Sequence, residues 1–242
     1  MKKGTPGPDN IPADLLRAGN TALYSVLAKH FNHYLENGMI PDQWNKSKTI
    51  LLFKKGQRED IANYRPISLL SVVYKTFTKI LLNRMERILD DYQPVEQNRF
   101  VDYKKAFDSV ETNAVLNALT HAGIPSMYIH LLEQCFSNKS TAIQLFDRKL
   151  EIPIERGVRQ GDTISPKLFT AALQHAMSEL DWEDKGYLID GKKISNLRFA
   201  DDIVLVANKT AEMETMINEL NVAGLKIGLE VNMSKTQLMV NQ

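Results

Sequence analysis

The chain has 242 residues, 43% hydrophobic and 24% charged, so it can bury the core of one large globular domain or two small ones. It contains no apolar run as long as a membrane span and no secretory signal behind its basic N-terminus, which predicts an intracellular protein, cytoplasmic or nuclear and not secreted. The single cysteine, Cys135, excludes an internal disulfide framework, and the formal net charge of +1 is by itself a poor nucleic-acid signature.

The charges are unevenly divided along the chain. Residues 1–100 carry 15 Lys+Arg and 10 Asp+Glu, a formal charge of +5, whereas residues 101–242 carry 15 and 19, a formal charge of −4. A basic half joined to an acidic half suits a protein that binds phosphates with one part and cations with the other. A chance distribution is the alternative interpretation.

The first predicted elements are helices and one strand. After a Gly/Pro-rich loop, residues 13–35 are expected to form one or two helices with an interruption near Gly19. Thr49–Phe53 is a short apolar run bounded by lysines, which predicts a strand. From Leu69 the pattern becomes helical, and six apolar residues share one face: Val73, Phe77, Ile80, Leu81, Met85 and Ile88.

The middle of the chain is expected to alternate strands and helices. Phe100–Tyr103 indicates the end of a strand, and Asp108 is expected to cap a helix that ends near Gly123. Four further elements are predicted from apolar spacing and turn residues: a helix at 126–136, strands at 142–146 and 150–154, and a helix capped by Ser165 and running to about residue 180.

The clearest hairpin lies near the C-terminal end. Apolar runs at 194–199 and 203–206 flank Ala200-Asp201-Asp202, and a last helix at 211–225 and a strand at 236–240 follow. This order of elements predicts an α+β fold with a mainly antiparallel sheet packed on helices.

Two adjacent aspartates at the tip of this hairpin are the most informative polar residues. Asp201 and Asp202 repel one another, and a bound divalent cation removes that cost. Asp102, from its own strand, would complete a site for two Mg²⁺ ions about 3.5–4 Å apart, which can activate a 3′-hydroxyl and stabilise a leaving pyrophosphate. For the hairpin alone, ordinary turn aspartates remain the alternative.

Six segments, in order, resemble conserved blocks of the reverse transcriptases of non-LTR (LINE-like) retrotransposons. They are GPDNIPADLLR (7–17), NYRPISLLSVVYKTFTKILLNRM (63–85), VDYKKAFDSVE (101–111), GVRQGDTISPKLF (157–169), FADD (199–202) and GLEVNMSKTQLM (228–239). The resemblance covers nearly the whole chain. It implies a right-hand polymerase fold with a partial fingers-like region at residues 1–99, a palm-like region at residues 100–242 and no thumb.

The resemblance also implies an activity. The chain would be an RNA-directed DNA polymerase, a nucleotidyltransferase that joins dNTPs to a primer 3′-OH by a two-metal mechanism. Its cofactor would be Mg²⁺, with Mn²⁺ as a substitute, and its partners would be an RNA template, a DNA primer and dNTPs. The sequence does not determine the oligomeric state.

Site residues follow from the same resemblance. Asp102, Asp201 and Asp202 would be the metal-binding catalytic carboxylates, with a less direct role for Asp202, and Lys235 would protonate the departing pyrophosphate. Six residues would contact the incoming nucleotide or the template base: Lys54, Arg65, Tyr103, Phe107, Gln160 and Gly161.

Physical arguments support three of these assignments. The ring of Phe107 would exclude a ribose 2′-hydroxyl, the guanidinium of Arg65 suits a triphosphate, and Gly161 permits close backbone approach. The simpler alternatives are a core aromatic for Phe107 and solvated surface lysines for Lys54 and Lys235.

Two departures from the family pattern support a second hypothesis. Between Gln97 and Val101 the chain has three residues where the family carries a Gly-Phe-Arg motif, a helix and the start of the catalytic strand. No thumb is expected after Gln242. The second hypothesis is a catalytically inactive retroelement remnant that binds nucleic acid or protein. A third, an RNA polymerase or nucleotide cyclase with a palm-like fold, is disfavoured by Phe107.

Overall fold

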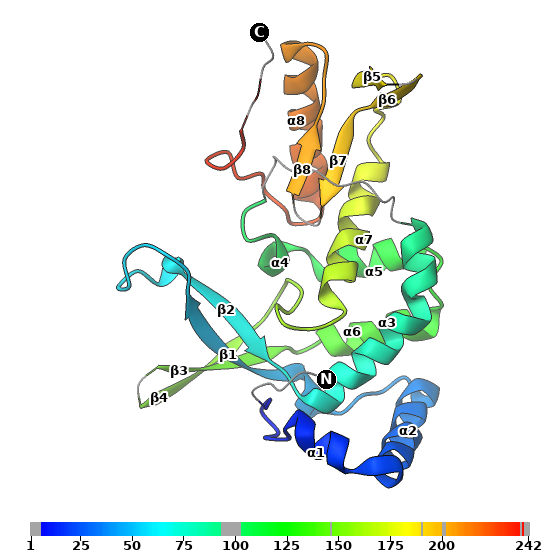
Figure 1. Cartoon of the computed structure of the whole chain (residues 1–242), viewed down its shortest axis with the longest axis vertical. Helices are drawn as coiled ribbons and strands as arrows, with labels where there is room; N and C mark the ends of the chain where they lie inside the picture. Colours follow the sequence, from blue (N-terminus) through cyan, green and yellow to red (C-terminus); the bar gives the residue numbers. More distant parts are fainter. Residues whose placement is uncertain are drawn as a thin grey trace. The chain divides into compact units, whose positions relative to one another are not determined.

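The computed structural model describes residues 6–92, 103–145, 147–189, 191–199, 202–237 and 239. The chain forms two compact units, shown in Figure 1. The first unit comprises Met1–Glu86, Ile124–Glu155 and Arg159–Ser165, and the second comprises Arg87–Gly123, Arg156–Val158 and Pro166–Gln242.

The first unit combines a sheet with helices. Its elements are α1 (Ala13–Ala18), α2 (Asn20–Asn37), the 3-10 turns η1 (Asp42–Asn45) and η2 (Ile61–Asn63), β1 (Lys46–Phe53), β2 (Tyr64–Leu69), most of α3 (Val72–Tyr92), α6 (Ser126–Phe136), β3 (Ser140–Leu145) and β4 (Arg148–Pro153). Gly19 separates α1 from α2, and α6 occupies the predicted range, so both helical predictions are confirmed.

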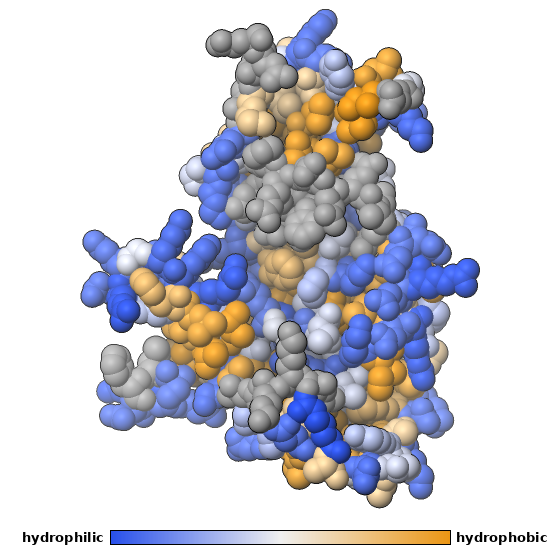
Figure 2. All heavy atoms as spheres, in the orientation of Figure 1, coloured by the Kyte–Doolittle hydropathy of each residue, from blue (hydrophilic) through white to orange (hydrophobic). Residues whose placement is uncertain are grey.

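The sheet of the first unit has the strand order β2-β1-β3-β4 (Figure 1). β1 pairs antiparallel with β2 and parallel with β3, and β3 pairs antiparallel with β4. Inside the sheet, the hydroxyls of Thr49 and Thr141 lie 2.7 Å apart and satisfy one another. Figure 2 shows hydrophobic side chains gathered over these strands. Leu52 and Phe53 of β1 and Leu150 of β4 are exposed.

β2 was not predicted because Pro66 interrupts its sequence pattern. Proline cannot donate to a ladder hydrogen bond, so it is tolerated on edge strands. β2 is an edge strand of the four-stranded sheet, and Pro66 faces Leu51 on β1. The edge position of β2 therefore accommodates Pro66, although proline is unfavourable inside a sheet.

Aromatic rings fill the core of the first unit. The ring of Phe77, which is fully buried on α3, lies 5.3 Å from that of Phe31, 5.3 Å from that of Trp44 and 6.1 Å from that of Tyr34. The predicted helical face of α3 is confirmed in its centre, where Phe77, Leu81 and Met85 are buried. This cluster joins α2, η1 and α3 into one core.

The second unit contains three longer helices and two hairpins. Its elements are the end of α3, α4 (Ala106–Ser109), α5 (Thr112–His121), α7 (Ser165–Ser178), β5 (Tyr187–Ile189), β6 (Lys192–Ile194), β7 (Asn196–Phe199), β8 (Asp202–Leu205) and α8 (Thr210–Lys226). Its core includes Leu119 of α5, Phe169 of α7 and Leu220 of α8. The predicted helices at 165–180 and 211–225 correspond to α7 and α8, although the buried hydroxyl of Ser165 has no hydrogen-bond partner in the described part of the chain.

The prediction that Asp108 caps a long helix was wrong. Asp108 lies inside the short helix α4, and α5 begins after Glu111, whose side chain makes no capping hydrogen bond. Lys105, with φ of 45°, turns the chain into α4, and the backbone N–H of Glu111 donates to the carbonyl of Ile227 at 2.9 Å. The predicted long helix is thus broken between α4 and α5, where the backbone of Glu111 bonds to a residue distant in sequence. The capping pattern did not predict this break.

The C-terminal strand prediction also failed for the residues that the structure describes. Thr236 follows a turn at residues 233–235 and its N–H donates to the carbonyl of Asn232 at 3.0 Å, and residues 238 and 240 lie outside the described part. The β5–β6 hairpin was not predicted, because its strands have only three residues each. Across the described ranges, no helix has the length and apolar character needed to span a bilayer.

Lys139 is a buried cation of the first unit. Its side chain is only 2% exposed, and its amino group lies 4.8 Å from the centre of the Phe136 ring. Burial, assisted by the nearby charge of Arg159, lowers the pKa of Lys139 to about 8. The charged form of this lysine therefore destabilises the folded state.

Replacing Phe77 by alanine is expected to lower the free energy of unfolding by about 3–5 kcal/mol, because the change removes a fully buried ring and leaves a cavity. Urea denaturation would measure the loss. Lys79→Ala, at an exposed position of the same helix, should change stability by less than about 0.5 kcal/mol. Equal effects of the two substitutions would contradict this assignment of the core.

Replacing Lys139 by methionine is expected to raise the free energy of unfolding by about 1–3 kcal/mol at pH 7. The folded-state pKa of about 8 lies below the ordinary value of 10.5, so the cost of the charge is full below pH 8 and disappears as the pH rises towards 10.5. Chemical denaturation between pH 7 and 10.5 should show the gain shrinking over that interval. Lys149→Met, at an exposed position of β4, is the control, and a gain independent of pH would refute the explanation.

Candidate functional site

The predicted catalytic carboxylates lie at the limits of the described structure. Asp102 and Asp201 fall outside the described residues, and only the backbone of Asp202 is described. β8 begins at Asp202, whose backbone pairs with that of Phe199 at the end of β7. The predicted hairpin is therefore confirmed on both sides of residues 200 and 201, whereas the meeting of the three carboxylates stays a prediction.

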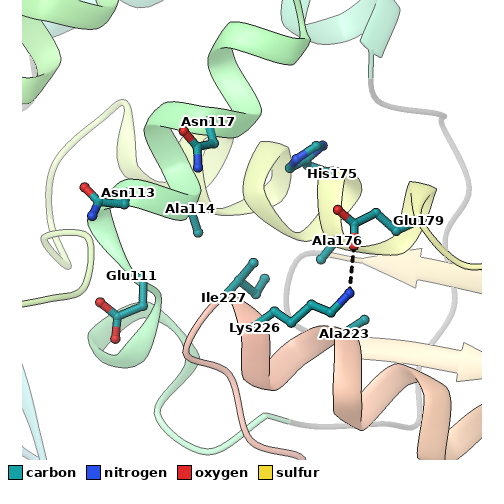
Figure 3. A pocket seen from close by; sticks show the side chains of 10 residues that line it. All are labelled: Glu111, Asn113, Ala114, Asn117, His175, Ala176, Glu179, Ala223, Lys226 and Ile227. Atoms are coloured by element: carbon teal, nitrogen blue, oxygen red, sulfur yellow. Dashed lines mark hydrogen bonds and ion pairs between the residues drawn. The ribbon is translucent and has the colours of Figure 1, made fainter.

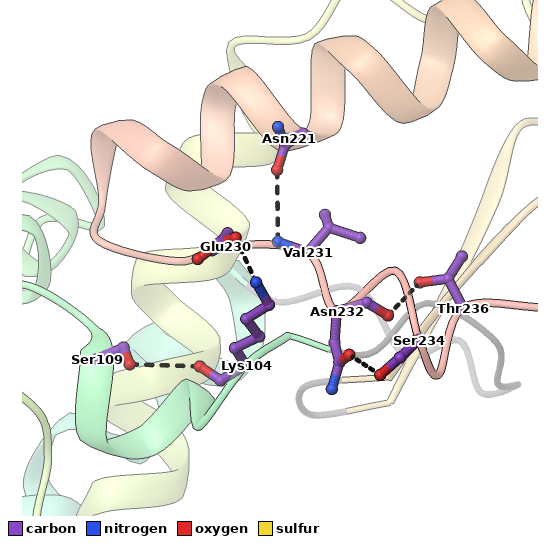
Figure 4. Close-up of polar contacts among 8 residues, drawn as sticks. All are labelled: Lys104, Ser109, Asn221, Glu230, Val231, Asn232, Ser234 and Thr236. Atoms are coloured by element: carbon purple, nitrogen blue, oxygen red, sulfur yellow. Dashed lines mark hydrogen bonds and ion pairs between the residues drawn. The ribbon is translucent and has the colours of Figure 1, made fainter.

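The residue that follows Asp102 is tied to the C-terminal segment of the second unit. Tyr103 forms an antiparallel bridge with Val231, and the N–H of Lys104 donates to the carbonyl of Glu230 at 2.9 Å. The side chains of Lys104 and Glu230 add an ion pair, drawn in Figure 4. Two segments that are distant in sequence thus run side by side, starting at residue 103 in one of them.

Asn232 organises the turn that carries Lys235, as Figure 4 shows. Its side-chain Oδ1 accepts a hydrogen bond from the hydroxyl of Ser234 at 2.7 Å, and its carbonyl accepts from the hydroxyl of Thr236 at 2.9 Å. The N–H of Lys235 donates to the same carbonyl at 3.0 Å, and the Lys235 side chain is exposed. Lys235 therefore lies on an ordered turn four residues after the partner of Tyr103.

The side chain of Tyr103 belongs to the core of the second unit. It is 1% exposed, and a Cβ atom on Gly224 of α8 would lie 3.0 Å from its ring. Burial raises the pKa of its hydroxyl, which has no hydrogen-bond partner among the described residues. A nucleotide contact at this position would have to come from the backbone, because the ring is covered.

Phe107 is held in place by a second ring and by the backbone. Its half-buried ring stacks on that of Phe169 in α7, with 4.8 Å between the ring centres and 16° between the planes. Its carbonyl accepts a hydrogen bond from the N–H of Val158 at 2.7 Å. The preceding Gly157 has φ of +87°, and a Cβ there would lie 2.7 Å from the carbonyl oxygen of Asp108. These contacts restrict the orientation of the Phe107 ring. A side chain that excludes a ribose 2′-hydroxyl needs such a fixed orientation.

Gln160 and Gly161 lie against the edge strand β2 in the first unit. The carbonyl of Gln160 accepts a hydrogen bond from the N–H of Ser68 at 3.0 Å. Gly161 has φ of +110°, and a Cβ atom there would lie 2.8 Å from the carbonyl oxygen of Ser68. Both the backbone conformation and the close approach therefore require glycine.

Two buried charged residues flank this pair, and the sequence reasoning did not assign either of them. Arg159 is 4% exposed and donates to the carbonyls of Trp44 at 2.8 Å and Asn45 at 2.9 Å. Asp162 is 5% exposed and accepts hydrogen bonds from the hydroxyls of Tyr74 at 2.8 Å and Thr78 at 3.0 Å. The sequence feature that could have identified them is the pair of opposite charges on either side of Gln160-Gly161.

The two cations proposed to contact the triphosphate lie on one hairpin of the first unit. Arg65 on β2 faces Leu52 on β1, and Lys54 directly follows β1, where its N–H donates to the carbonyl of Asn63 at 2.9 Å. Both side chains are exposed. The structure thus presents them to solvent from a common element.

A pocket of about 320 Å³ lies among α5, α7 and α8 of the second unit, as Figure 3 shows. Its lining includes Asn117, His175 and the ion pair of Glu179 with Lys226, whose atoms are 3.1 Å apart. The hydrogen bond and charge of Lys226 lower the pKa of Glu179. Among the described residues, none of those predicted for nucleotide transfer lines this pocket. The described residues also include no cluster of three or more His, Cys, Asp or Glu suited to a metal ion.

Comparison with known proteins identifies the family. Residues 53–242 match the family described as reverse transcriptase (RNA-dependent DNA polymerase). The chain is 29% identical over 260 residues to the retrovirus-related Pol polyprotein from type-1 retrotransposable element R2 of Nasonia vitripennis, covering 95% of this chain and 25% of that protein. It is 25% identical over 240 residues to the probable RNA-directed DNA polymerase from transposon BS of Drosophila melanogaster, covering 84% of this chain and 26% of that protein.

The chain spans about a quarter of the length of these two relatives. The match to the Nasonia protein extends over 260 residues, more than the 242 of this chain, although it covers 95% of the chain. Within the matched region, that relative therefore has positions with no counterpart here. This agrees with a shortened stretch such as the one inferred between Gln97 and Val101, without locating it.

The fold resembles solved telomerase structures. The structure of apo telomerase from Candida tropicalis truncated from its C-terminal domain aligns with a TM-score of 0.59 at 13% identity, covering 89% of this chain and 55% of that one. At this identity the likeness concerns the fold alone, and it confirms the predicted right-hand polymerase class. Because the family match covers most of the sequence and the fold agrees with it, the chain belongs to the reverse transcriptase (RNA-dependent DNA polymerase) family, with relatives among the Pol proteins of non-LTR retrotransposons.

Proposed function

We propose that this chain carries the nucleotide-transfer centre of an RNA-directed DNA polymerase, which extends a DNA primer on an RNA template with dNTPs. The observation that supports it most directly is the pairing of Tyr103 with Val231. This pairing brings the segment after Asp102 alongside the segment that leads to the Lys235 turn. In this proposal, residues 1–99 act as the fingers-like region and residues 100–242 as the palm-like region.

The donor set suits magnesium. Asp102, Asp201 and Asp202 offer carboxylate oxygens, which are the ligands that Mg²⁺ prefers, and Mn²⁺ accepts the same donors. When bound, the ions would supply charge stabilisation for the attacking 3′-hydroxyl and the departing pyrophosphate. This assignment concerns the chemistry of the side chains, since two of the three residues lie outside the described part.

The remaining residues would bind the incoming nucleotide, orient it and exclude ribonucleotides. The exposed side chains of Lys54 and Arg65 would contact the triphosphate, and Gln160 and Gly161 would offer a backbone surface close to the base pair. Phe107, stacked on Phe169, would exclude the 2′-hydroxyl. Lys235 would donate a proton to the pyrophosphate oxygen. Such a polymerase would act in the cytoplasm or nucleus, where its nucleic-acid partners occur.

The substitution Asp201→Asn is expected to reduce Mg²⁺-dependent primer extension by at least about 10²-fold, because it removes a charged metal ligand and preserves side-chain size. Extension of a DNA primer on an RNA template would be measured with and without a chelator. Glu214→Gln, at an exposed position of α8, is the matched control and should retain extension. Template binding without extension, in the unaltered chain and in Asp201→Asn alike, would select the inactive remnant instead.

The substitution Phe107→Val is expected to lower the preference for dNTPs over rNTPs by about 10–100-fold, because a smaller side chain no longer fills the space beside the 2′ position. Single-nucleotide incorporation gives kcat/KM for a matched dNTP and rNTP pair. Phe53→Val, which alters an exposed ring of the first unit, should leave the preference unchanged. Unchanged discrimination in Phe107→Val would assign Phe107 to packing alone.

A further inference from the structure

Asp162 ties the loop at Arg159–Asp162 to helix α3. A buried carboxylate is costly unless hydrogen bonds replace its hydration. Tyr74 and Thr78 are four residues apart on α3, so they share one face of the helix, and both hydroxyls donate to Asp162, at 2.8 Å to one oxygen and 3.0 Å to the other. We call these three residues the hydroxyl–carboxylate clamp.

Arg159 ties the other end of the same loop to the start of β1. Its guanidinium donates to the carbonyls of Trp44 and Asn45, which end the η1 turn, and lies 5.6 Å from the centre of the Tyr74 ring. Arg159 and Asp162 therefore anchor the loop on either side of Gln160-Gly161. A segment held at both ends by buried charged groups has little freedom to move between them.

The anchored loop in turn contacts β2. Gln160 accepts from the N–H of Ser68, and Gly161 lies so close to the carbonyl of Ser68 that no side chain would fit. Ser68 follows Arg65 by three residues on the same strand. All of these residues belong to the first unit, so the loop and the strand that carries Arg65 form one connected arrangement.

We infer that the hydroxyl–carboxylate clamp of Tyr74, Thr78 and Asp162 positions Gln160-Gly161 relative to Arg65, and that these three are positioning residues for nucleotide binding. The inference rests on the proposed function, because it assigns the clamp to the same nucleotide site. The clamp residues do not touch the nucleotide. They hold the backbone that would meet it, so a displacement of that backbone would weaken nucleotide binding.

The electrostatic surroundings favour a clamp that persists over a wide pH range. Burial, followed by the negative charge of Asp162, raises the pKa of Tyr74 well above its ordinary value. The Tyr74 hydroxyl therefore keeps its proton and continues to donate under alkaline conditions. Thr78 does not titrate in this range, so the donors on α3 remain available.

Removing either donor hydroxyl tests the inference. In Tyr74→Phe and Thr78→Val, KM for the matched dNTP should rise about tenfold, with kcat changed less than about threefold, because binding geometry is altered more than the chemical groups. Discrimination against a mispaired dNTP should fall in both variants. Thr78→Ser keeps a hydroxyl and should restore the original KM.

Matched control variants distinguish a displaced Gln160-Gly161 loop from a general loss of stability of the first unit. Thr76→Val removes a hydroxyl on the same helix that donates to the carbonyl of Val72, and Tyr24→Phe removes an exposed tyrosine hydroxyl of the first unit. Leu35→Ala should destabilise the same unit through a buried side chain on α2. All three should leave KM for the dNTP unchanged, and a similar rise in KM in any of them would overturn the inference.

Amide hydrogen exchange gives a readout that does not depend on catalysis. In Tyr74→Phe and Thr78→Val, exchange at the N–H of Ser68 should accelerate about tenfold or more relative to the three controls, because its acceptor on Gln160 is released. Unchanged exchange at Ser68 would overturn the clamp. If the unaltered chain does not extend a primer while Ser68 responds as expected, the proposed function fails and the clamp itself stands.

Discussion

The hydrogen bonding of two buried charges is the constraint on which the first unit depends. Asp162 and Arg159 are almost fully enclosed, so each must replace its hydration with protein donors or acceptors. Asp162 uses two hydroxyls of α3, and Arg159 uses two carbonyls that precede β1. Since those partners come from distant parts of the sequence, these hydrogen bonds also fix where the loop between the two charges meets β2.

Backbone contacts have the corresponding role in the second unit. Gly157 has a positive φ and lies closer to the carbonyl of Asp108 than a side chain would permit, and Val158 donates to the carbonyl of Phe107. The bridge between Tyr103 and Val231 joins the segment after Asp102 to the turn organised by Asn232. In each case main-chain groups carry the contact that joins two segments distant in sequence.

Family membership and enzymatic activity rest on different observations. The match over residues 53–242 establishes the family, and the telomerase-like fold agrees with it. The proposed activity depends on three carboxylates, for which the structure describes at most a backbone. The longer match to the Nasonia relative shows that this chain is shorter within the compared region. The described contacts around Phe107, Gly161 and Lys235 are present in this chain despite that difference.

The amino-acid sequence predicted the family, the α+β class and most helices, because ordered motifs and helical spacing are local patterns. It identified the break at Gly19, helix α6 and the hairpin that flanks residues 200 and 201. The positions of Asp108 within α4 and of Pro66 on an edge strand became evident from the folded structure alone. The same holds for the burial of Arg159, Asp162 and Lys139, since the cost of enclosing a charge depends on partners that only folding brings together.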